Sequence, residues 1–200
     1  MTLSDKRSTL ARLSTAVVLG EWDEVRRLRA SAPAGEPDRE WREAVLQTHL
    51  FAGFPRLVEA YGVLAECGGL GPPEPGEETP DDEEALRERG RALFERIYAG
   101  EAEAVRALLA GHQPAFADWI ESHAYGRVLS RPGLSPDRRE LLATCALAAL
   151  GQERQLASHA RGSLRCGATP AQLEAALAAV RDLVPPGRYD RALRLVQRLP

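Results

Sequence analysis

The chain has 200 residues, of which 44% are hydrophobic and 28% are charged, and its formal net charge is −3. This composition is typical of a soluble globular protein and gives no overall attraction to nucleic acid. No apolar run approaches the roughly 18 residues needed to span a bilayer, and the N-terminal residues lack the hydrophobic core of a secretion signal. We therefore expect a cytoplasmic protein that binds neither nucleic acid nor a membrane.

Ala, Leu, Arg and Glu dominate the sequence, while aromatic residues make up only 6% of it. Such a composition favours helices over sheets. The three cysteines, Cys67, Cys145 and Cys166, show no CxxC spacing, so neither a disulfide framework nor a metal site is indicated. An all-α protein without a metal or a cofactor is expected.

After a first pair of helices, the apolar periodicity predicts helices over residues 37–50 and 56–66, with a break at 51–55. His49 falls at the end of the first of these helices, where a histidine commonly caps the last carbonyl groups. The inward side of the second helix is expected to consist of Leu57, Val58, Tyr61 and Leu64.

Residues 68–84 are rich in Pro, Gly and acidic side chains, which predicts a solvated, mobile linker. Beyond it, helices are expected over residues 86–98, 101–110 and 114–129. The last of these has an apolar side made of Phe116, Trp119, Ile120, His123 and Val128. We expect His123 to be a packed, hydrogen-bonded structural residue.

The stretch from Leu134 to Thr169 carries the residues that we expect to do chemistry. Ser135 and Pro136 resemble an N-cap followed by proline in the first helical turn, and Gly151 interrupts the helical pattern. On one straight helix, Glu140 and His159 would lie about 28 Å apart. If the chain reverses at Gly151, the two side chains lie on neighbouring antiparallel helices within reach of each other.

The first residues repeat this pattern. Residues 3–20 align without a gap with residues 134–151, with identities that include Arg7 with Arg138, Leu10 with Leu141 and Gly20 with Gly151. The economical explanation is an internal duplication. Glu140 then corresponds to Thr9 and His159 to Leu28, so we expect one competent copy and one that serves as scaffold.

Three segments resemble a known family. They are RRELL followed by ALAALGQERQLASHARGSLRCGAT, FAGFPRLVEAY, and PAFADWIESHAYGRVLSRPGLS. The chain is similar in these segments to the carboxymuconolactone decarboxylase and alkylhydroperoxidase D family. The resemblance implies an all-α, alkylhydroperoxidase-D-like fold that assembles as rings of six repeats, and hence a homotrimer for a chain with two repeats.

From the duplication and the family resemblance, residues 1–67 are expected to form a degenerate N-terminal repeat. Residues 68–84 are expected to form an acidic, Pro/Gly-rich linker, and residues 85–200 are expected to form a carboxymuconolactone decarboxylase-like repeat. The peroxidase branch of the family carries a CxxC pair at positions that Gln152 and Gln155 occupy here. Because a thiol peroxidase needs both thiols, and Cys145 lies in an apolar stretch, we do not expect that activity.

The remaining groups suit proton transfer. The resemblance and the residue types together predict His159 as the acid or base, with Glu140 fixing its tautomer and raising its pKa. Gln152 and Gln155, near His159 along one helix, and Arg131, in the segment SRPGLS, are the candidates for binding a small substrate.

Two functions stay open at this point. One is a decarboxylase-like or isomerase-like enzyme acting on a small carboxylated or lactone substrate. The other is a non-catalytic oligomeric scaffold or small-molecule binding protein, in which His159 is structural and Glu140 acts only with the helix dipole. A sealed apolar surrounding of the pair would favour the scaffold.

Overall fold

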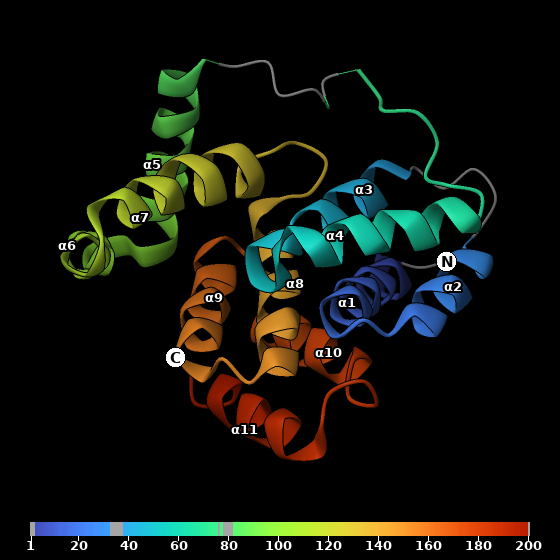
Figure 1. Ribbon diagram of the computed structural model, residues 1–200. Coiled ribbons are helices and arrows are strands. Elements are labelled where there is room, and N and C mark those ends of the chain that lie inside the picture. The colour runs from blue at the N-terminus through green and yellow to red at the C-terminus, as the bar shows by residue number, and fades with distance from the viewer. Residues whose placement is uncertain (1–2, 33–37, 76, 78–81, 200) are drawn as a thin grey trace.

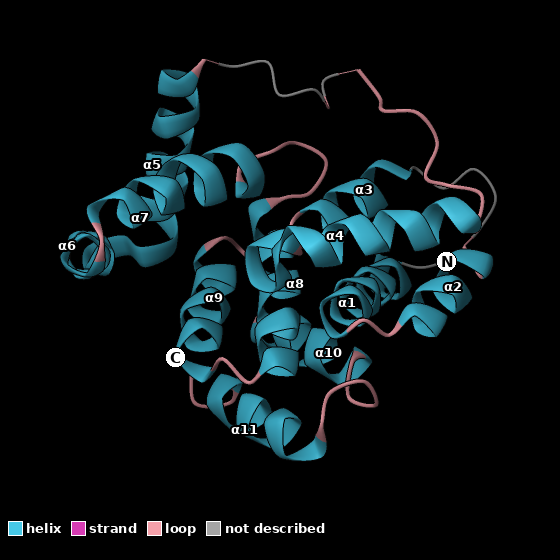
Figure 2. Cartoon of the chain, viewed as in Figure 1, coloured by secondary structure: helices cyan, strands magenta, loops and turns pink. Residues whose placement is uncertain are grey.

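The computed structural model describes residues 3–32, 38–75, 77 and 82–199. Over these residues the chain is built from helices, turns and loops, with no strand (Figure 2). The predicted all-α fold class is confirmed. In chain order the helices are α1 (Leu3–Leu19), α2 (Trp22–Ala30), α3 (Asp38–Leu46), α4 (His49–Glu66), α5 (Glu83–Tyr98), the 3₁₀ turn η1 (Ala99–Glu101), α6 (Ala102–His112), α7 (Pro114–Trp119), the π-helix η2 (Ile120–Leu129), α8 (Pro136–Leu150), α9 (Glu153–Arg165), α10 (Pro170–Ala179) and α11 (Pro186–Val196).

Helix α8 lies at the centre of the molecule. Figure 1 shows α9 on one side of it and α1 on the other, with α10 and α11 beneath and the α5–α7 region forming a separate lobe. Every residue from Arg139 to Ala149 is buried. A helix that is enclosed by neighbours on all sides needs apolar or small residues all round, which agrees with its run of Ala and Leu.

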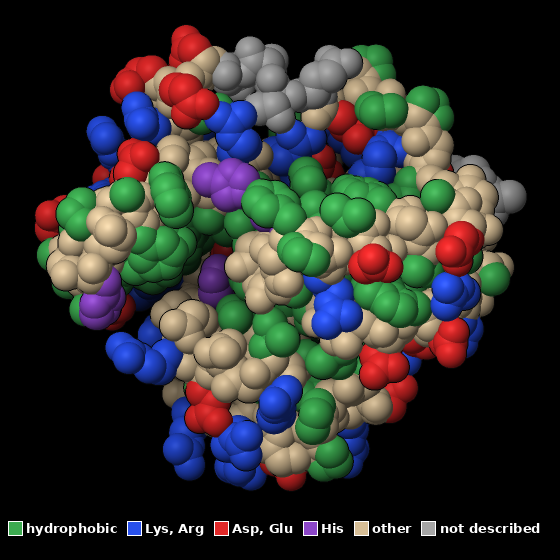
Figure 3. Space-filling view, in the orientation of Figure 1, with side chains coloured by type: hydrophobic (Ala, Val, Ile, Leu, Met, Phe, Trp, Pro, Cys, Tyr) green, Lys and Arg blue, Asp and Glu red, His purple; other side chains and the backbone are tan. Residues whose placement is uncertain are grey.

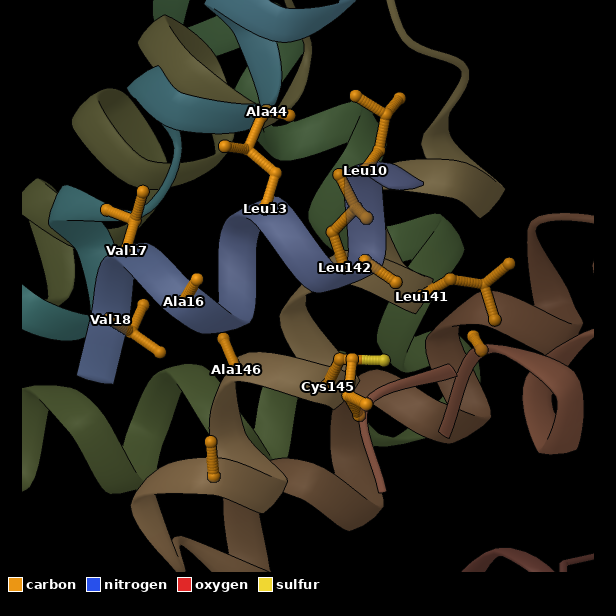
Figure 4. Close-up of a cluster of buried hydrophobic side chains, with 14 of the residues drawn as sticks. Leu10, Leu13, Ala16, Val17, Val18, Ala44, Leu141, Leu142, Cys145 and Ala146 are labelled. Carbon is orange, nitrogen blue, oxygen red and sulfur yellow. The ribbon is translucent and has the colours of Figure 1, made fainter. Parts of the chain in front are cut away.

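The hydrophobic side chains gather in two cores. The larger core joins helices α1 to α4 with α8 to α11, and Figure 4 shows the part of it where side chains of α1 meet Leu142 and Ala146 of α8. The smaller core lies between α5, α6 and η2 and also includes Cys166. Residues of both 1–67 and 85–200 therefore share one core, while the domain boundaries themselves stay a prediction.

Among the described residues between Gly68 and Asp82, Leu70, Glu74 and Glu77 attach the loop to the rest of the molecule. Leu70 is buried, and Glu77 is buried with a carboxylate that accepts from Nε of Arg42 at 2.7 Å. Residues 76 and 78–81 of the predicted linker lie outside the described residues. The expectation of a fully solvated linker is therefore wrong at Leu70 and Glu77, because an apolar side chain and an ion pair anchor them.

Helical periodicity predicted the buried faces of residues 114–129 and 56–66 only in part. Phe116 and Trp119 were expected to point inward, but they are 42% and 64% exposed. These two residues lie in α7, whereas η2, which follows it, is a π-helix and buries Ala124, Tyr125 and the predicted Val128. On α4 the buried stripe instead follows the residues Leu57, Ala60 and Leu64, so that Val58 and Tyr61 are exposed.

The two histidines that were expected to be structural contact each other. His49 lies just after α3, and its Nδ1 is 2.5 Å from the carbonyl oxygen of Leu46, the last residue of that helix. Its Nε2 lies 2.9 Å from Nε2 of His123. The capping role of His49 and the hydrogen-bonded role of His123 are thus confirmed. No helix in the described part of the chain is both long enough and apolar enough to cross a membrane.

Candidate functional site

The reversal that builds the site occurs at Gly151. This residue has φ of 74° and ψ of 27°, a left-handed conformation that glycine adopts without a steric cost. The amide of Gln152 then donates to the carbonyl of Leu147 at 3.0 Å and closes the end of α8. The chain turns back, and α9 packs along α8 as the sequence predicted.

This packing brings the predicted acid and imidazole together. Nδ1 of His159 lies 2.9 Å from Oε2 of Glu140, a hydrogen-bond distance. The ring of Phe51 stands edge-on to the imidazole, with 5.9 Å between ring centroids. Because a carboxylate accepts, Nδ1 carries the proton and Nε2 is left for another partner.

The two side chains of the pair differ in their exposure to solvent. The side chain of Glu140 is 1% exposed, while that of His159 retains 12% exposure. The imidazole is therefore not sealed from solvent, although the carboxylate behind it is. On this face the molecule is hollowed between the α5–α7 lobe and the central helices, and histidine side chains lie at the rim and inside the hollow (Figure 3).

Burial and the carboxylate act on His159 in opposite directions. Burial lowers the pKa of the imidazole because it penalises the charged form. The negative charge and the hydrogen bond of Glu140 raise it, and the net pKa lies above the ordinary value. The geometry thus favours an imidazolium that is held by a buried carboxylate.

The second oxygen of Glu140 has no partner among the described residues. Oε1 is buried without a hydrogen bond, and the negative charge of Glu140 acts on the nearby phenols of Tyr98 and Tyr125. These two phenols share a hydrogen bond of 3.2 Å, and burial raises the pKa of both. A buried carboxylate oxygen without a donor is costly, so this side of the site is poised for a polar group or a proton.

Gly162 allows α9 to come this close. A Cβ atom at this position would lie 2.6 Å from Oε2 of Glu140 and 2.9 Å from Cγ2 of Ile97. Phe51, Tyr98, Tyr125 and Gly162 were not identified from the sequence. The sequence signal for Gly162 was a glycine in the middle of a predicted helix. Glycine lowers helix stability there, so it indicates a position at which a larger side chain would not fit.

The other predicted site residues lie elsewhere. Gln152 and Gln155 are exposed at the start of α9, one turn or more from His159, and their role in binding substrate stays a prediction. Arg131 donates through Nε to Glu43 at 3.0 Å and also contacts the carbonyl of Glu77. Its guanidinium belongs to an ion-pair cluster of α3 and the linker, so Arg131 has no part in the proposal below.

The cluster around Glu43 has a structural purpose. Nη2 of the buried Arg139 lies 2.7 Å from the Glu43 carboxylate, which therefore binds two guanidinium groups. Arg139 also donates to the backbone carbonyl of Arg131 at 3.0 Å. These bonds fix the loop before α8 against α3, and with it the start of the helix that carries Glu140.

The thiols are unsuited to peroxide chemistry. Burial raises the pKa of Cys145 to about 12 and that of Cys166 to about 11. Both are therefore protonated at neutral pH, whereas a thiol peroxidase attacks as a thiolate. Within the described part of the chain, no group of three or more His, Cys, Asp or Glu side chains is placed to hold a metal ion.

The fold and the buried acid and imidazole define an all-helical class of protein, and sequence comparison identifies it. Residues 114–197 match the model of the Carboxymuconolactone decarboxylase family. The match extends from α7 past the end of α11 and contains both Glu140 and His159. The C-terminal part of the chain therefore matches the model of this family, and the predicted resemblance is confirmed over these residues.

Two relatives agree with this assignment. The chain is similar to Peroxisomal protein 2 of Schizosaccharomyces pombe, with 29% identity over 138 residues that cover 68% of this chain and 64% of that protein. It is also similar to 4-carboxymuconolactone decarboxylase of Acinetobacter baylyi, with 39% identity over 59 residues that cover 30% of this chain and 44% of that protein. The matched regions span less than two thirds of each relative's length. Together the comparisons support a carboxymuconolactone decarboxylase-like protein.

Proposed function

We propose that this protein is a proton-transfer lyase that acts on a small carboxylated or lactone substrate, with His159 as the acid/base group. The observation that carries the proposal is the 2.9 Å contact between a buried carboxylate and a partly exposed imidazole whose pKa is raised. Perturbed titratable pairs of this kind are typical of active sites. The substrate class is taken from the name of the bacterial relative.

In the proposed reaction the bond between a substrate carbon and its carboxylate breaks, and CO₂ leaves. The electron pair stays on the carbon as an enolate, and Nε2–H of the His159 imidazolium delivers a proton to that carbon. Solvent then returns the proton to Nε2. Glu140 acts as a positioning residue, since its bond to Nδ1 fixes the tautomer and stabilises the charged ring.

The test is turnover of a panel of lactone acids and 2-oxo acids by the full chain in D₂O, followed by NMR. The His159→Asn variant retains an amide donor at the place of Nδ1 and lacks Nε2. It is expected to lose about a hundredfold or more in rate, the usual contribution of general acid catalysis. The control is His112→Asn, a change to an exposed histidine at the end of α6. Equal turnover by His159→Asn and the unchanged protein would remove His159 from the mechanism.

The alternative is a non-catalytic oligomeric scaffold or small-molecule binding protein of the same fold. Gln152 and Gln155 stand where the peroxidase branch of the family carries its two cysteines. This supports the alternative, because the thiol chemistry of that branch is lost in this chain. Compounds of the panel that bind without turnover or deuterium incorporation would favour this alternative over the lyase.

The protein is further proposed to form a homotrimer in the cytoplasm. The family resemblance supports a homotrimer, and the exposed apolar side chains of Phe54, Val58 and Trp119 offer surface for contacts between copies. Light scattering of the purified protein measures its mass directly. A cytoplasmic location is proposed from the sequence, and cell fractionation with peroxisomal markers tests it against the location in the yeast relative's name.

A further inference from the structure

A cavity of about 280 Å³ lies between α1, α8 and α10, on a different side of α8 from the Glu140–His159 pair. Its walls include the buried side chains of Leu10, Leu141 and Leu142. Figure 4 shows these three leucines together where α1 passes α8. Four polar side chains, those of Arg7, Ser8, Arg138 and Gln172, also line the cavity. The site therefore combines an apolar interior with polar groups, as binding pockets for small molecules do.

The two sides of the cavity come from matching positions in the chain. Arg7 and Leu10 of α1 align with Arg138 and Leu141 of α8 at the offset found in the sequence, and all four line the cavity. The two arginines nevertheless differ in their surroundings. Arg138 is bound by Glu40, with 2.9 Å between Nη2 and Oε2. Arg7 has no carboxylate partner among the side chains that the structure describes.

Gln172 adds a second donor. Its Oε1 accepts from the backbone amide of Thr169 at 2.9 Å in the capping box of α10. Because that bond uses the carbonyl oxygen, the NH₂ group of the same side chain remains a donor. Arg7 and Gln172 together offer positive charge and hydrogen bonds to an anionic group, and planar carboxylates match a guanidinium well.

We propose that this cavity is a second binding site, which takes a small monocarboxylate with an aromatic or short aliphatic body. The carboxylate lies against Arg7 and Gln172, and the body packs between Leu10, Leu141 and Leu142. The volume is at the lower end of that of ligand pockets, which suits a ligand of the size of benzoate. This inference does not depend on the proposed function of His159.

The probe is benzoate, titrated into the full-length protein and followed by calorimetry and by NMR of backbone amides. Shifts are expected in α1, α8 and α10. Arg7→Gln is expected to weaken binding about tenfold to a hundredfold, the usual contribution of a charge-assisted hydrogen bond. Arg194→Gln removes the same charge from an exposed position of α11 and is expected to leave binding unchanged. The neutral analogue benzamide should bind weakly and be insensitive to Arg7→Gln.

A second pair of variants tests the cavity itself. Ala175 is exposed and lines the cavity, so Ala175→Leu should fill its opening and abolish binding without disturbing the core. Ala178→Leu adds the same side chain on α10 outside the cavity and should have no effect. Loss of benzoate binding in Arg194→Gln or in His159→Asn, or its retention in both Arg7→Gln and Ala175→Leu, would overturn the proposal.

Discussion

At the scale of single residues, the pKa of His159 is set by two opposing influences, burial and the charge of Glu140. Burial alone would favour a neutral imidazole, and only the adjacent carboxylate reverses this preference. The charged state of His159 therefore depends on one neighbour.

Removal of that neighbour gives a direct prediction. In Glu140→Gln the hydrogen-bond geometry is kept but the negative charge is lost, so burial acts without opposition. We expect the pKa of His159 to fall from above its ordinary value to below it, as measured by NMR titration of the imidazole resonances. His112 in the same spectra serves as an internal reference, and an unchanged pKa of His159 would show that Glu140 does not control it.

The pH dependence of stability follows from the same raised pKa. Since the folded state binds the His159 proton more tightly than the unfolded state, the stabilising contribution is full below about pH 6.5, the unfolded value. It is lost as the pH rises through the raised pKa of the folded state. The free energy of unfolding in urea, compared between the unchanged protein and His159→Asn, should therefore show a difference that decreases with pH. A difference that grows with pH would contradict this.

The sequence allowed Glu140 and His159 to be paired because a helix stop at Gly151 and the helical rise are both local signals. It did not identify Phe51, Tyr98 or Tyr125, which come from α4, α5 and η2, since no local rule places these helices beside α9. The ion pair of Arg131 could not be predicted for a related reason. Its partner Glu43 is far away in the chain, so nothing near Arg131 indicated that its charge was already engaged.

At the scale of elements, the approach of α9 to α8 depends on the missing side chain of Gly162. Gly162→Ala places a methyl group against Glu140 and Ile97, so either the helices separate or the ion pair shifts. We expect a loss of about 1–3 kcal/mol in the free energy of unfolding, the usual cost of overpacking. Thermal and urea unfolding measure it.

The matched control for this prediction is Gly62→Ala in α4. Gly62 is exposed in the helix, and a Cβ atom there would meet nothing within 4 Å. Since alanine is a better helix former, this change should stabilise the protein by about 0.5–1 kcal/mol. Equal effects of the two changes would show that α8 and α9 do not require the glycine.

The contact of α3 with α8 depends on Glu43. Glu43→Ala leaves the buried guanidinium of Arg139 without its carboxylate and also removes that carboxylate from Arg131. Breaking a buried pair in this way costs about 3–5 kcal/mol. Glu66→Ala, which removes an exposed ion pair with Arg26, should cost at most about 1 kcal/mol. Urea titrations that showed similar losses would indicate that the Glu43 cluster is dispensable.

Helix ends were easier to predict than helix faces. Pro136, Gly151 and the Thr169-Pro170 pair act through fixed backbone angles and local hydrogen bonds, and the structure has helix boundaries at each of them. The inward face of residues 114–129 was predicted correctly at Val128 but not at Phe116 and Trp119, and a sequence read with a period of 3.6 does not reveal the π-helix that follows α7. The close approach of Gly90 in α5 to Gly126 in η2 is likewise a contact between helices and not within one.

At the scale of the whole molecule, the N-terminal helices complete the core of the C-terminal ones. Leu10 and Ala16 of α1 lie beside Leu142 and Ala146 of α8 in the larger core (Figure 4). A fragment of residues 85–200 would expose this apolar side of α8. We expect the fragment to lack a cooperative unfolding transition by circular dichroism while the full chain shows one. A sharp transition in the fragment would demonstrate an independent domain.

The all-α class and the family resemblance could be predicted because they depend on composition and on motifs that are contiguous in the chain. The division into an N-terminal and a C-terminal unit separated by a linker could not be established in this way, since it depends on which helices share a core. In the described residues the helices after the linker, α5 to η2, have their own small core, while α8 to α11 join the N-terminal helices.

The enclosure of α8 has a mechanical consequence. A helix that is packed against neighbours on all sides can shift only if those neighbours shift with it, because a close-packed interior has low compressibility. Leu141 and Leu142 follow Glu140 directly on this helix, so the cavity wall and the carboxylate behind the imidazole are held at a fixed spacing. Helix α8 thus carries side chains of two chemically separate sites on one rigid element.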